Sequence, residues 1–535
     1  MSRMSRFFLL LLFFVTYSTN AAELPIVSAA IPWADCEGYT PVVISVSSSS
    51  ERKLTIRAKV DSVEGRIAMV VGGGEAVRAT LLLPPLQTDN TNIGITWTSE
   101  DGLSGDLAVS TAANAHRRLA LAVIDSDENI PLKNLDFANA TTFPNHAHKG
   151  YTSSASGQTM VARIPRINLP ERWQGYPTWM TLVFAASDDL ALAAEQRSAI
   201  ATWVAAGGTV VIATSAQREA WRKVGVEPWL LNSSEKALIN RLNRIGAENE
   251  HPNVLISVPG TESVPATGFM LLATLFAVVV GPLNLWWVRR RGAPALFLLT
   301  TPALSLIFCV VLLGTNIIIE GLSLRRVASQ LTVLDQSHAR AIAWTRASYY
   351  GGFSVARFDV DSDAKVRRFE PEQNNGYSYR GRRDNESHAI DWRGGQQLSG
   401  EWIPARRNRQ LLYVTARTER AQLQLTRKGN QWQVTNGLGT ALRQLVWRNG
   451  DHVIHSCGPL QAGESTELAV GVGGFEIAEG GFDDAAKHAA AIRNEPWGFA
   501  AELESSFGAL PGPVSLDAVP LTSYVVGRLN PGNTP

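Results

Sequence analysis

The sequence carries little charge and almost no excess of either sign. Charged residues make up 18% of its 535 residues, and the formal net charge is +1. An average soluble chain has about 25% charged residues, so part of this chain is not ordinary soluble surface. Lysine plus arginine number 49 against 48 aspartate plus glutamate, which leaves no basic excess for binding phosphate backbones. The composition therefore excludes nucleic acid as a partner.

The chain also lacks a recognisable metal, cofactor or catalytic motif. His146 and His148 form an H-x-H pair without a further spaced ligand, which favours a solvated loop over a metal site. The acidic residues within 125–128 follow a predicted strand and favour a polar turn. The triple glycine at 72–74 precedes an alternating strand rather than a helix, so it indicates a turn and not a phosphate-binding loop. We predict no catalytic, cofactor-binding or metal-binding residues.

Three apolar blocks contain much of the hydrophobic surplus. In the first, Arg3 and Arg6 precede an apolar run from residue 7 to 17 and then small residues, the pattern of a signal peptide over residues 1–22. The run is shorter than the about 20 residues that cross a bilayer, although an uncleaved anchor stays open. A signal peptide would export the segment that follows.

The other two blocks, residues 266–288 and 295–319, contain no charged residue and are each long enough to cross a membrane. We expect a transmembrane hairpin with its turn at residues 289–294. Three adjacent arginines at 289–291 place this turn in the cytoplasm by the positive-inside rule. Both flanking segments would then lie outside the cytoplasm, at the bacterial inner membrane, with the lipid bilayer as a partner.

Residues within the two blocks predict how the helices pack. Gly281 and Pro282 predict a kink near the cytoplasmic end. Four polar residues at membrane depth predict hydrogen bonds between the helices: Asn284, Thr300, Thr301 and Asn316. Neither block has an ionisable residue, which argues against a transport pathway.

Two soluble segments have the alternating pattern of β-strands. Residues 23–115 predict a β-sandwich, with strands at 41–47, 53–60 and 77–83. Residues 320–535 predict a β-rich domain with one helix at 482–494. Its expected strands are at 330–335, 354–360, 410–417, 421–427, 431–436, 441–449 and 521–529. The polar stretch 370–407 favours a mobile surface loop over an anion-binding segment.

Residues 116–264 have a different pattern, in which apolar strands alternate with a helix. The runs at 119–125, 181–186 and 209–214 predict strands buried on both faces, as in a parallel α/β sheet. Apolar residues recur at helical spacing between the last two runs, with Asp188 and Asp189 at the expected start. Gly207 and Gly208 predict the helix end.

The run from Leu169 to Thr214, which contains TLVFAASDDLALAAEQRSAIATWVAAGGTVVIAT, resembles a degenerate class I glutamine-amidotransferase-like domain. Such domains occur in a family of bacterial membrane proteins whose hairpin contains GP-x-N and a basic turn, to which GPLNLWWVRRRG is similar. Genes of that family commonly lie beside those of MoxR-type AAA+ ATPases and von Willebrand factor A proteins. The resemblance implies partners in a MoxR and von Willebrand factor A system.

This segment departs from the pattern of a working amidotransferase. An active site of that type places a nucleophile on a strained turn after the buried strand, with a histidine as base. Here the strand is followed by Thr214 and Ser215 without the flanking glycines, and the nearest downstream histidine is His251. We therefore expect a cap or turn residue rather than a nucleophile at this position.

Cysteine is scarce, with 3 in the chain. Cys309 lies in the second predicted span, whereas Cys36 and Cys457 lie in the predicted exported segments, where oxidation permits a disulfide. These two would either tie the first domain to the last or remain unpaired small apolar residues.

The sequence as a whole predicts a multidomain membrane protein. It has an exported β-sandwich and an α/β amidotransferase-like domain, then a two-helix transmembrane hairpin and an exported C-terminal β-rich domain. We interpret it as a non-enzymatic membrane-anchored envelope protein that acts as a scaffold or interaction subunit. An exported hydrolase or a ligand-binding sensor that uses the α/β domain is the alternative.

Overall fold

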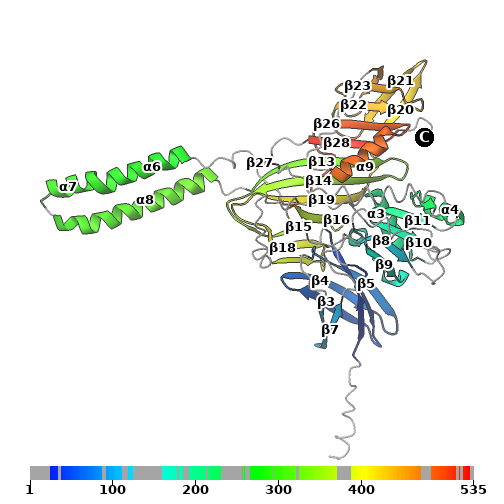
Figure 1. The fold of residues 1–535 in the computed structure, drawn as a ribbon, viewed down its shortest axis with the longest axis horizontal. Helices are drawn as coiled ribbons and strands as arrows, with labels where there is room; N and C mark the ends of the chain where they lie inside the picture. The colour runs from blue at the N-terminus through cyan, green and yellow to red at the C-terminus, as the bar shows by residue number, and fades with distance from the viewer. Residues whose placement is uncertain are drawn as a thin grey trace, which may run out of the picture.

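The computed structural model places most of the chain in β-strands. It describes residues 24–33, 38–86, 92–110, 119–124, 160–177, 180–184, 192–212, 215–230, 256, 258, 266–292, 294–320, 324–369, 387–471, 483–513, 517–518 and 522–529. Within those ranges, the strands form a five-stranded, a seven-stranded and a ten-stranded sheet and two three-stranded sheets. Figure 1 shows these sheets stacked along one axis, with a pair of long helices projecting to one side.

The N-terminal segment folds into short antiparallel strands. They are β1 (Ile26–Ala30), β2 (Thr40–Ser47), β3 (Arg52–Val60), β4 (Val63–Val71), β5 (Ala76–Leu83), β6 (Asn92–Ser99) and β7 (Ser104–Ser110). The strands predicted at 41–47, 53–60 and 77–83 are confirmed as β2, β3 and β5. Buried and exposed residues alternate along β3 and β6, because successive side chains of a strand point to opposite faces.

The next segment forms a parallel sheet with the strand order β12-β11-β10-β8-β9. Its strands are β8 (Leu119–Ile124), β9 (Met160–Ile164), β10 (Thr181–Phe184), β11 (Thr209–Ile212) and β12 (Trp229–Leu230). The short helices of this segment are η2 (Arg166–Asn168), η3 (Trp173–Gly175), η5 (Ser215–Gln217) and α4 (Arg218–Arg222). The predicted strands and their parallel pairing are confirmed.

The helix between β10 and β11 is α3 (Ala194–Ala205), and it begins later than the sequence predicts. Its first turn is capped by Gln196, whose side-chain oxygen accepts the N–H of Ala193 at 3.2 Å. Asp188 and Asp189 therefore do not begin this helix, and both lie outside the described residues. The predicted end is confirmed, since Gly207 has a left-handed φ of 108° that favours glycine.

Residues 266–320 form a helical arm that projects from the sheets (Figure 1). Its elements are α6 (Ala266–Val278), η6 (Val279–Leu283), α7 (Asn284–Arg290), η7 (Pro294–Leu296) and α8 (Phe297–Glu320). The predicted interruption at Pro282 appears as the π-helical segment η6, where proline removes a backbone hydrogen-bond donor.

The segment after the arm supplies the large sheet, with the order β16-β19-β14-β13-β28-β26-β22-β23-β25. Its long strands are β13 (Arg325–Asp335), β14 (Arg340–Tyr350), β16 (Ala364–Phe369), β19 (Arg409–Thr418), β22 (Leu442–Arg448), β26 (Gly498–Leu503) and β28 (Thr522–Arg528). Shorter strands and one helix complete this part: β20 (Gln422–Lys428), β21 (Gln431–Gly437), β23 (Ile454–Cys457), β24 (Ser465–Glu467), β25 (Ala469–Val470), β27 (Asp517–Ala518) and α9 (Asp483–Asn494). The predicted strands and helix of this segment are confirmed.

Strands from before and after the arm meet in the shared sheet, β15-β18-β17-β4-β3-β6-β7. Its last three elements in the chain are β15 (Val355–Val360), β17 (His388–Asp391) and β18 (Gln396–Ile403). The interpretation of 370–407 as a surface loop is thus wrong for residues 388–403, which bury Ile390, Leu398 and Trp402. Polar composition concealed these alternating apolar positions. β17 pairs in parallel with β4, so the predicted domains 23–115 and 320–535 contribute to one sheet.

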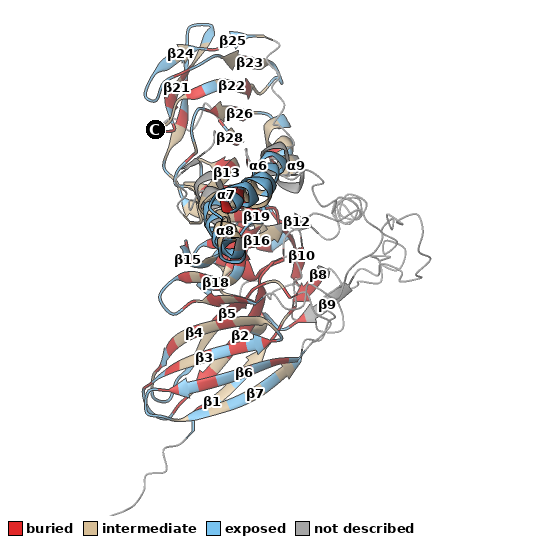
Figure 2. Cartoon of the chain, turned by 90° about the vertical axis from the view of Figure 1, so that its left-hand side faces the viewer, coloured by how far each residue is buried: buried red, intermediate tan, exposed pale blue. Residues whose placement is uncertain are grey.

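Three apolar clusters form the core, and the buried residues follow the sheets in Figure 2. The first cluster joins the N-terminal strands to the strands of residues 355–413. The second fills the parallel sheet and its contact with the large sheet, and the third lies around β20 to β26. Because two of the clusters span both sides of the arm in sequence, the soluble parts form one connected body.

Candidate functional site

The position expected for a nucleophile of the α/β domain is exposed. Ser215 begins η5 directly after β11, and its side chain faces solvent. Within the described residues, no histidine or carboxylate hydrogen-bonds to Ser215, while Thr214 and His251 lie outside those residues. The structure therefore brings together no nucleophile and base at this strand end among the residues it describes.

The other candidate positions are mostly outside the described residues. This holds for His146 and His148 and for the acidic residues within 125–128. The described residues contain no group of three or more histidine, cysteine or acidic side chains that could hold a metal ion. Residues 72–74 form the predicted turn, in which Gly74 has a φ of 86°.

The cysteines show no disulfide within the described part of the chain. Cys457 is a free, half-buried thiol on β23, and burial raises its pKa to about 11. Cys309 is free and exposed on α8, whereas Cys36 lies outside the described residues. A thiol with a raised pKa is mostly protonated at neutral pH, so Cys457 is not activated as a nucleophile.

The segment that carries the family resemblance is fixed by aromatic side chains. Trp203 of α3 donates from Nε1 to the Pro177 carbonyl at 2.8 Å and stacks against Tyr176 at 5.4 Å. Trp33 also packs against Tyr176, with the ring centroids 5.5 Å apart, and donates from Nε1 to the Gly175 carbonyl at 2.8 Å. These contacts place the segment 173–177 between the N-terminal strands and α3.

The same segment also contacts strands that follow the arm. Lys365 of β16 is buried, and its Nζ donates to the Tyr176 carbonyl at 2.9 Å. Gln174 donates from Nε2 to the Ser362 carbonyl at 2.7 Å. The Arg172 guanidinium lies over the Trp392 ring, 4.7 Å from its centroid. The segment 172–177 therefore links all three soluble parts of the chain.

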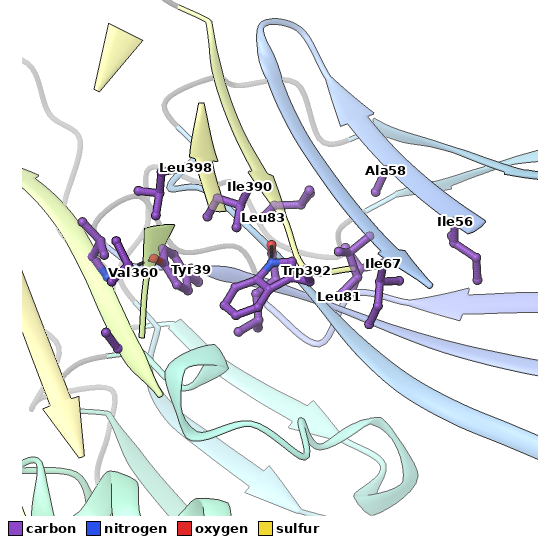
Figure 3. Packing of buried hydrophobic residues seen from close by; sticks show 14 of the residues in the cluster. Tyr39, Ile56, Ala58, Ile67, Leu81, Leu83, Val360, Ile390, Trp392 and Leu398 are labelled. Atoms are coloured by element: carbon purple, nitrogen blue, oxygen red, sulfur yellow. Dashed lines mark hydrogen bonds between the residues drawn. The ribbon is translucent and has the colours of Figure 1, made fainter. Parts of the chain in front are cut away.

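Trp392 lies where the two halves of the chain meet (Figure 3). It follows β17, is 6% exposed, and donates from Nε1 to the Leu82 carbonyl at 2.9 Å. Its ring packs edge-on against Tyr39, with the centroids 6.1 Å apart. The Tyr39 hydroxyl in turn accepts the N–H of Val366 at 3.0 Å. These contacts join residues from before the arm to residues from after it.

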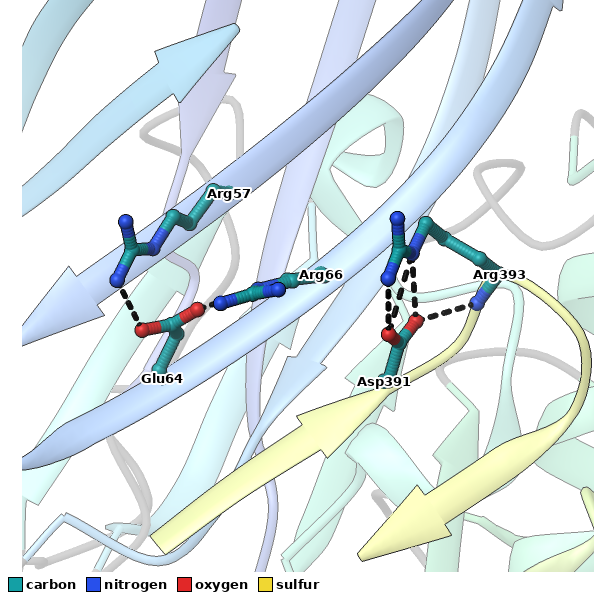
Figure 4. A network of polar contacts seen from close by, with 5 residues as sticks. All are labelled: Arg57, Glu64, Arg66, Asp391 and Arg393. Atoms are coloured by element: carbon teal, nitrogen blue, oxygen red, sulfur yellow. Dashed lines mark hydrogen bonds and ion pairs between the residues drawn. The ribbon is translucent and has the colours of Figure 1, made fainter. Parts of the chain in front are cut away.

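Two separate ion clusters lie on the paired strands β4 and β17 (Figure 4). Glu64 hydrogen-bonds to Arg57 and Arg66, and Asp391 accepts from Nη2 of Arg393 at 2.7 Å. Burial would raise the pKa of Glu64, but the two arginines outweigh it and hold that pKa below its ordinary value. The hydrogen bonds from Arg393 similarly lower the pKa of Asp391. Both carboxylates are therefore stabilised in their charged form.

We expect stability to fall at acid pH through these carboxylates. Because folding lowers both pKa values, their contribution is complete above the unfolded-state values of about 4 and is lost as the pH drops through the folded-state values. Urea unfolding of the full-length protein between pH 7 and 3 measures the loss. The variant with Glu64→Gln and Asp391→Asn should show a shallower pH dependence. An unchanged slope in this variant would show that other groups cause the acid sensitivity.

The helical arm has an exposed apolar surface, unlike a core helix. By length and composition, Met270–Arg290 is the one helix among the described residues that could cross a membrane, and Phe297–Leu312 is apolar but shorter. Only 11% of the apolar window in the first helix is buried. Figure 2 shows the arm largely exposed, and its exposed side chains are mostly apolar.

The two halves of the arm contact each other at the predicted polar position. Asn284 of α7 is 3% exposed and donates from Nδ2 to Oγ1 of Thr301 on α8 at 3.2 Å. Phe276 and Phe308 pack further along the arm, with their ring centroids 4.8 Å apart. The Thr300 hydroxyl finds no partner among the described residues, and the side chain of Asn316 lies outside them.

We expect Asn284→Leu to weaken the contact between α7 and α8. A hydrogen bond between helices in a bilayer contributes about 0.6 to 2 kcal/mol, and leucine keeps the volume but not the donor. Unfolding of the arm in bicelles would measure the loss. Thr301→Val is the matched change on the other helix, and the double variant should lose little more than either single one. Fully additive losses would contradict a direct bond.

Comparison with known proteins gives no family for this chain. No family model matches it, and no curated protein matches it. The yeast delta-COP-I mu-homology domain is a structural match with 7% identity and a TM-score of 0.19, covering 39% of this chain and 96% of that domain.

Two enzymes also appear among the structural matches. For a Paenibacillus cycloisomaltooligosaccharide glucanotransferase the identity is 10%, the coverage 35% of this chain and 27% of that one, and the TM-score 0.15. A Parabacteroides merdae β-glucuronidase has 7% identity and a TM-score of 0.16, and the match covers 94% of this chain and 76% of that one. Scores this low carry no argument about fold or function.

Proposed function

We propose that the protein is a non-enzymatic, membrane-anchored envelope protein that acts as a scaffold or interaction subunit. The parallel pairing of β4 with β17 carries this proposal. These strands lie before and after the helical arm in sequence, and they can share a sheet only on one side of a membrane. An arm that leaves and re-enters the same side crosses twice, as a hairpin. The exposed apolar surface of the arm supports this path.

The basic turn of the arm gives the orientation. Arg289, Arg290 and Arg291 favour the cytoplasmic side, which leaves the sheets outside the cytoplasm of a bacterial inner membrane. Arg291 lies 4.3 Å from the ring centroid of Trp287, and Arg290 lies 5.4 Å from that of Trp286. Tryptophan beside arginine suits the headgroup region, where amphipathic rings concentrate.

Protease protection in spheroplasts tests the anchor. An epitope inserted after Gly292 should be protected in intact spheroplasts and cleaved after lysis, whereas an epitope at the C-terminus should be cleaved in both. Cleavage of the first epitope in intact spheroplasts would overturn the hairpin. Cleavage of the first epitope together with protection of the C-terminal epitope would place the sheets in the cytoplasm.

The partners of this scaffold are proposed from the family resemblance, namely membrane proteins of a MoxR and von Willebrand factor A system. Because the hairpin would leave only residues 289–294 in the cytoplasm, the ATPase would be reached through other membrane subunits. Purification in mild detergent from native expression levels should recover these subunits with the protein. Repeated recovery of the protein alone would contradict the assignment.

A further inference from the structure

Two turns lie together at the end of the large sheet from which the arm projects. β13 begins there at Arg325, shortly after α8, and pairs with the last residue of β14. The turn 351–354 follows β14, and the turn 404–408 precedes β19, which pairs with the same end of β14. The backbone N–H of Arg406 donates to the Gly351 carbonyl at 2.8 Å, which joins the two turns.

Both turns lie next to residues that flank the arm in the sequence. The side chains of Asn408 and Gln410 donate to the carbonyl of Ile256, ahead of α6, at 3.4 and 3.2 Å. On the exit side, a Cβ added at Gly351 would lie 3.2 Å from the side chain of Leu324. The two turns therefore lie beside residues that precede and follow the arm in the sequence. If the arm crosses a membrane, these turns lie at its outer surface.

The turns present the side chains of a membrane-interface contact. Phe353 is 63% exposed, and Arg406 and Arg407 are exposed on the neighbouring turn. An aromatic ring gains by entering the boundary between headgroups and acyl chains, and arginine forms bidentate hydrogen bonds with phosphate. Arg406 has a left-handed φ of 55°, so the turn holds a conformation that is unusual for arginine.

We propose that residues 351–354 and 404–408 form an interfacial rim that binds phospholipid headgroups of the outer leaflet. Phe353 enters the headgroup boundary, while Arg406 and Arg407 bind lipid phosphates. The rim rests on the proposed anchoring by the arm, with which it is continuous. It would hold the sheets against the bilayer instead of leaving them free to tilt on the arm.

Spin labels on the full-length protein in nanodiscs of phosphatidylglycerol and phosphatidylcholine test the rim. With the native cysteines replaced by serine, single labels are placed at Phe353→Cys, at Leu306→Cys in the arm, and at Val470→Cys on β25. Leu306 and Val470 are 67% and 73% exposed, so both accept a label. The Phe353 label should be accessible to oxygen and protected from a water-soluble nickel chelate, as in a bilayer interface. The Val470 label should be open to the chelate.

The three labels separate failure of the rim from failure of the anchor. The rim would be overturned, and the anchor kept, if the Phe353 label were as accessible to the chelate as the Val470 label while the Leu306 label stayed protected. A Leu306 label open to the chelate would overturn both.

Charge-removing variants test the phosphate contacts. Arg406→Asn keeps a residue type that tolerates the left-handed turn, and it is combined with Arg407→Gln. Protection of the Phe353 label should increase with the phosphatidylglycerol fraction in the parent, and this dependence should be lost in the double variant. Arg420→Gln, an exposed arginine beyond the other end of β19, is the matched control and should retain it. The same lipid dependence in all three proteins would overturn the role of the arginines.

Discussion

Trp392→Ala is expected to destabilise the segments on both sides of the arm together, by about 3 to 5 kcal/mol. The indole is nearly fully buried, and it contacts Tyr39 and donates to the Leu82 carbonyl, both from the segment before the arm. Alanine would leave a cavity in the first cluster and an unpaired carbonyl beside it. The loss should therefore spread to strands that are about 300 residues away in sequence.

Hydrogen exchange of the full-length protein measures this spread. In Trp392→Ala, amides of β3, β4 and β6 should lose protection along with those of β17 and β18. Trp432→Ala is the control, because Trp432 packs against the third cluster and touches none of these strands. If β3 and β4 keep their protection while β17 and β18 lose theirs, the two segments are independent domains. That result would remove the main support for the hairpin.

Local patterns in the sequence predict slightly fewer than half of the described strands and, apart from the parallel α/β sheet, do not predict how the strands pair. Alternation in the sequence predicts β2, β3 and β5, although only β3 alternates between buried and less buried residues along its whole length. β14 has no such pattern, since it is buried on nearly every residue of RAIAWTRASYY, and it was not predicted. The pairing of β4 with β17 joins positions far apart in the chain, and no local periodicity encodes it.

The candidate site shows the same limit. Asn284 and Thr301 could be predicted as partners, because two adjacent spans with a short turn bring their polar residues to the same depth. The rim could not be predicted, because Phe353 and Arg407 belong to different turns that meet only through the register of β13, β14 and β19. Arg406 and Arg407 lie at the end of the stretch 370–407, which its composition predicts to be a surface loop. Composition does not show that they lie beside the turn that contains Phe353.

Leu306→Arg is expected to block membrane insertion of the arm. Leu306 lies near the middle of α8 and is 67% exposed, so its side chain would face lipid if the arm crosses the bilayer. Arginine at the centre of a membrane helix costs about 2.5 to 3.5 kcal/mol on insertion scales. The variant should appear increasingly in the fraction extracted by alkaline carbonate, whereas the parent should stay in the membrane pellet.

Leu298→Arg distinguishes a membrane effect from a general effect of charge. Leu298 is 83% exposed on the same helix, close to the basic turn, where an arginine side chain can reach the headgroups. This variant should insert like the parent. An arm surrounded by water would tolerate arginine at both positions. In an arm covered by a protein partner, the effect of arginine would depend on the partner residues at each position and not on the distance from the helix end. Equal insertion of the two variants would therefore exclude a bilayer-spanning arm, because only a bilayer makes the cost depend on distance from the helix end.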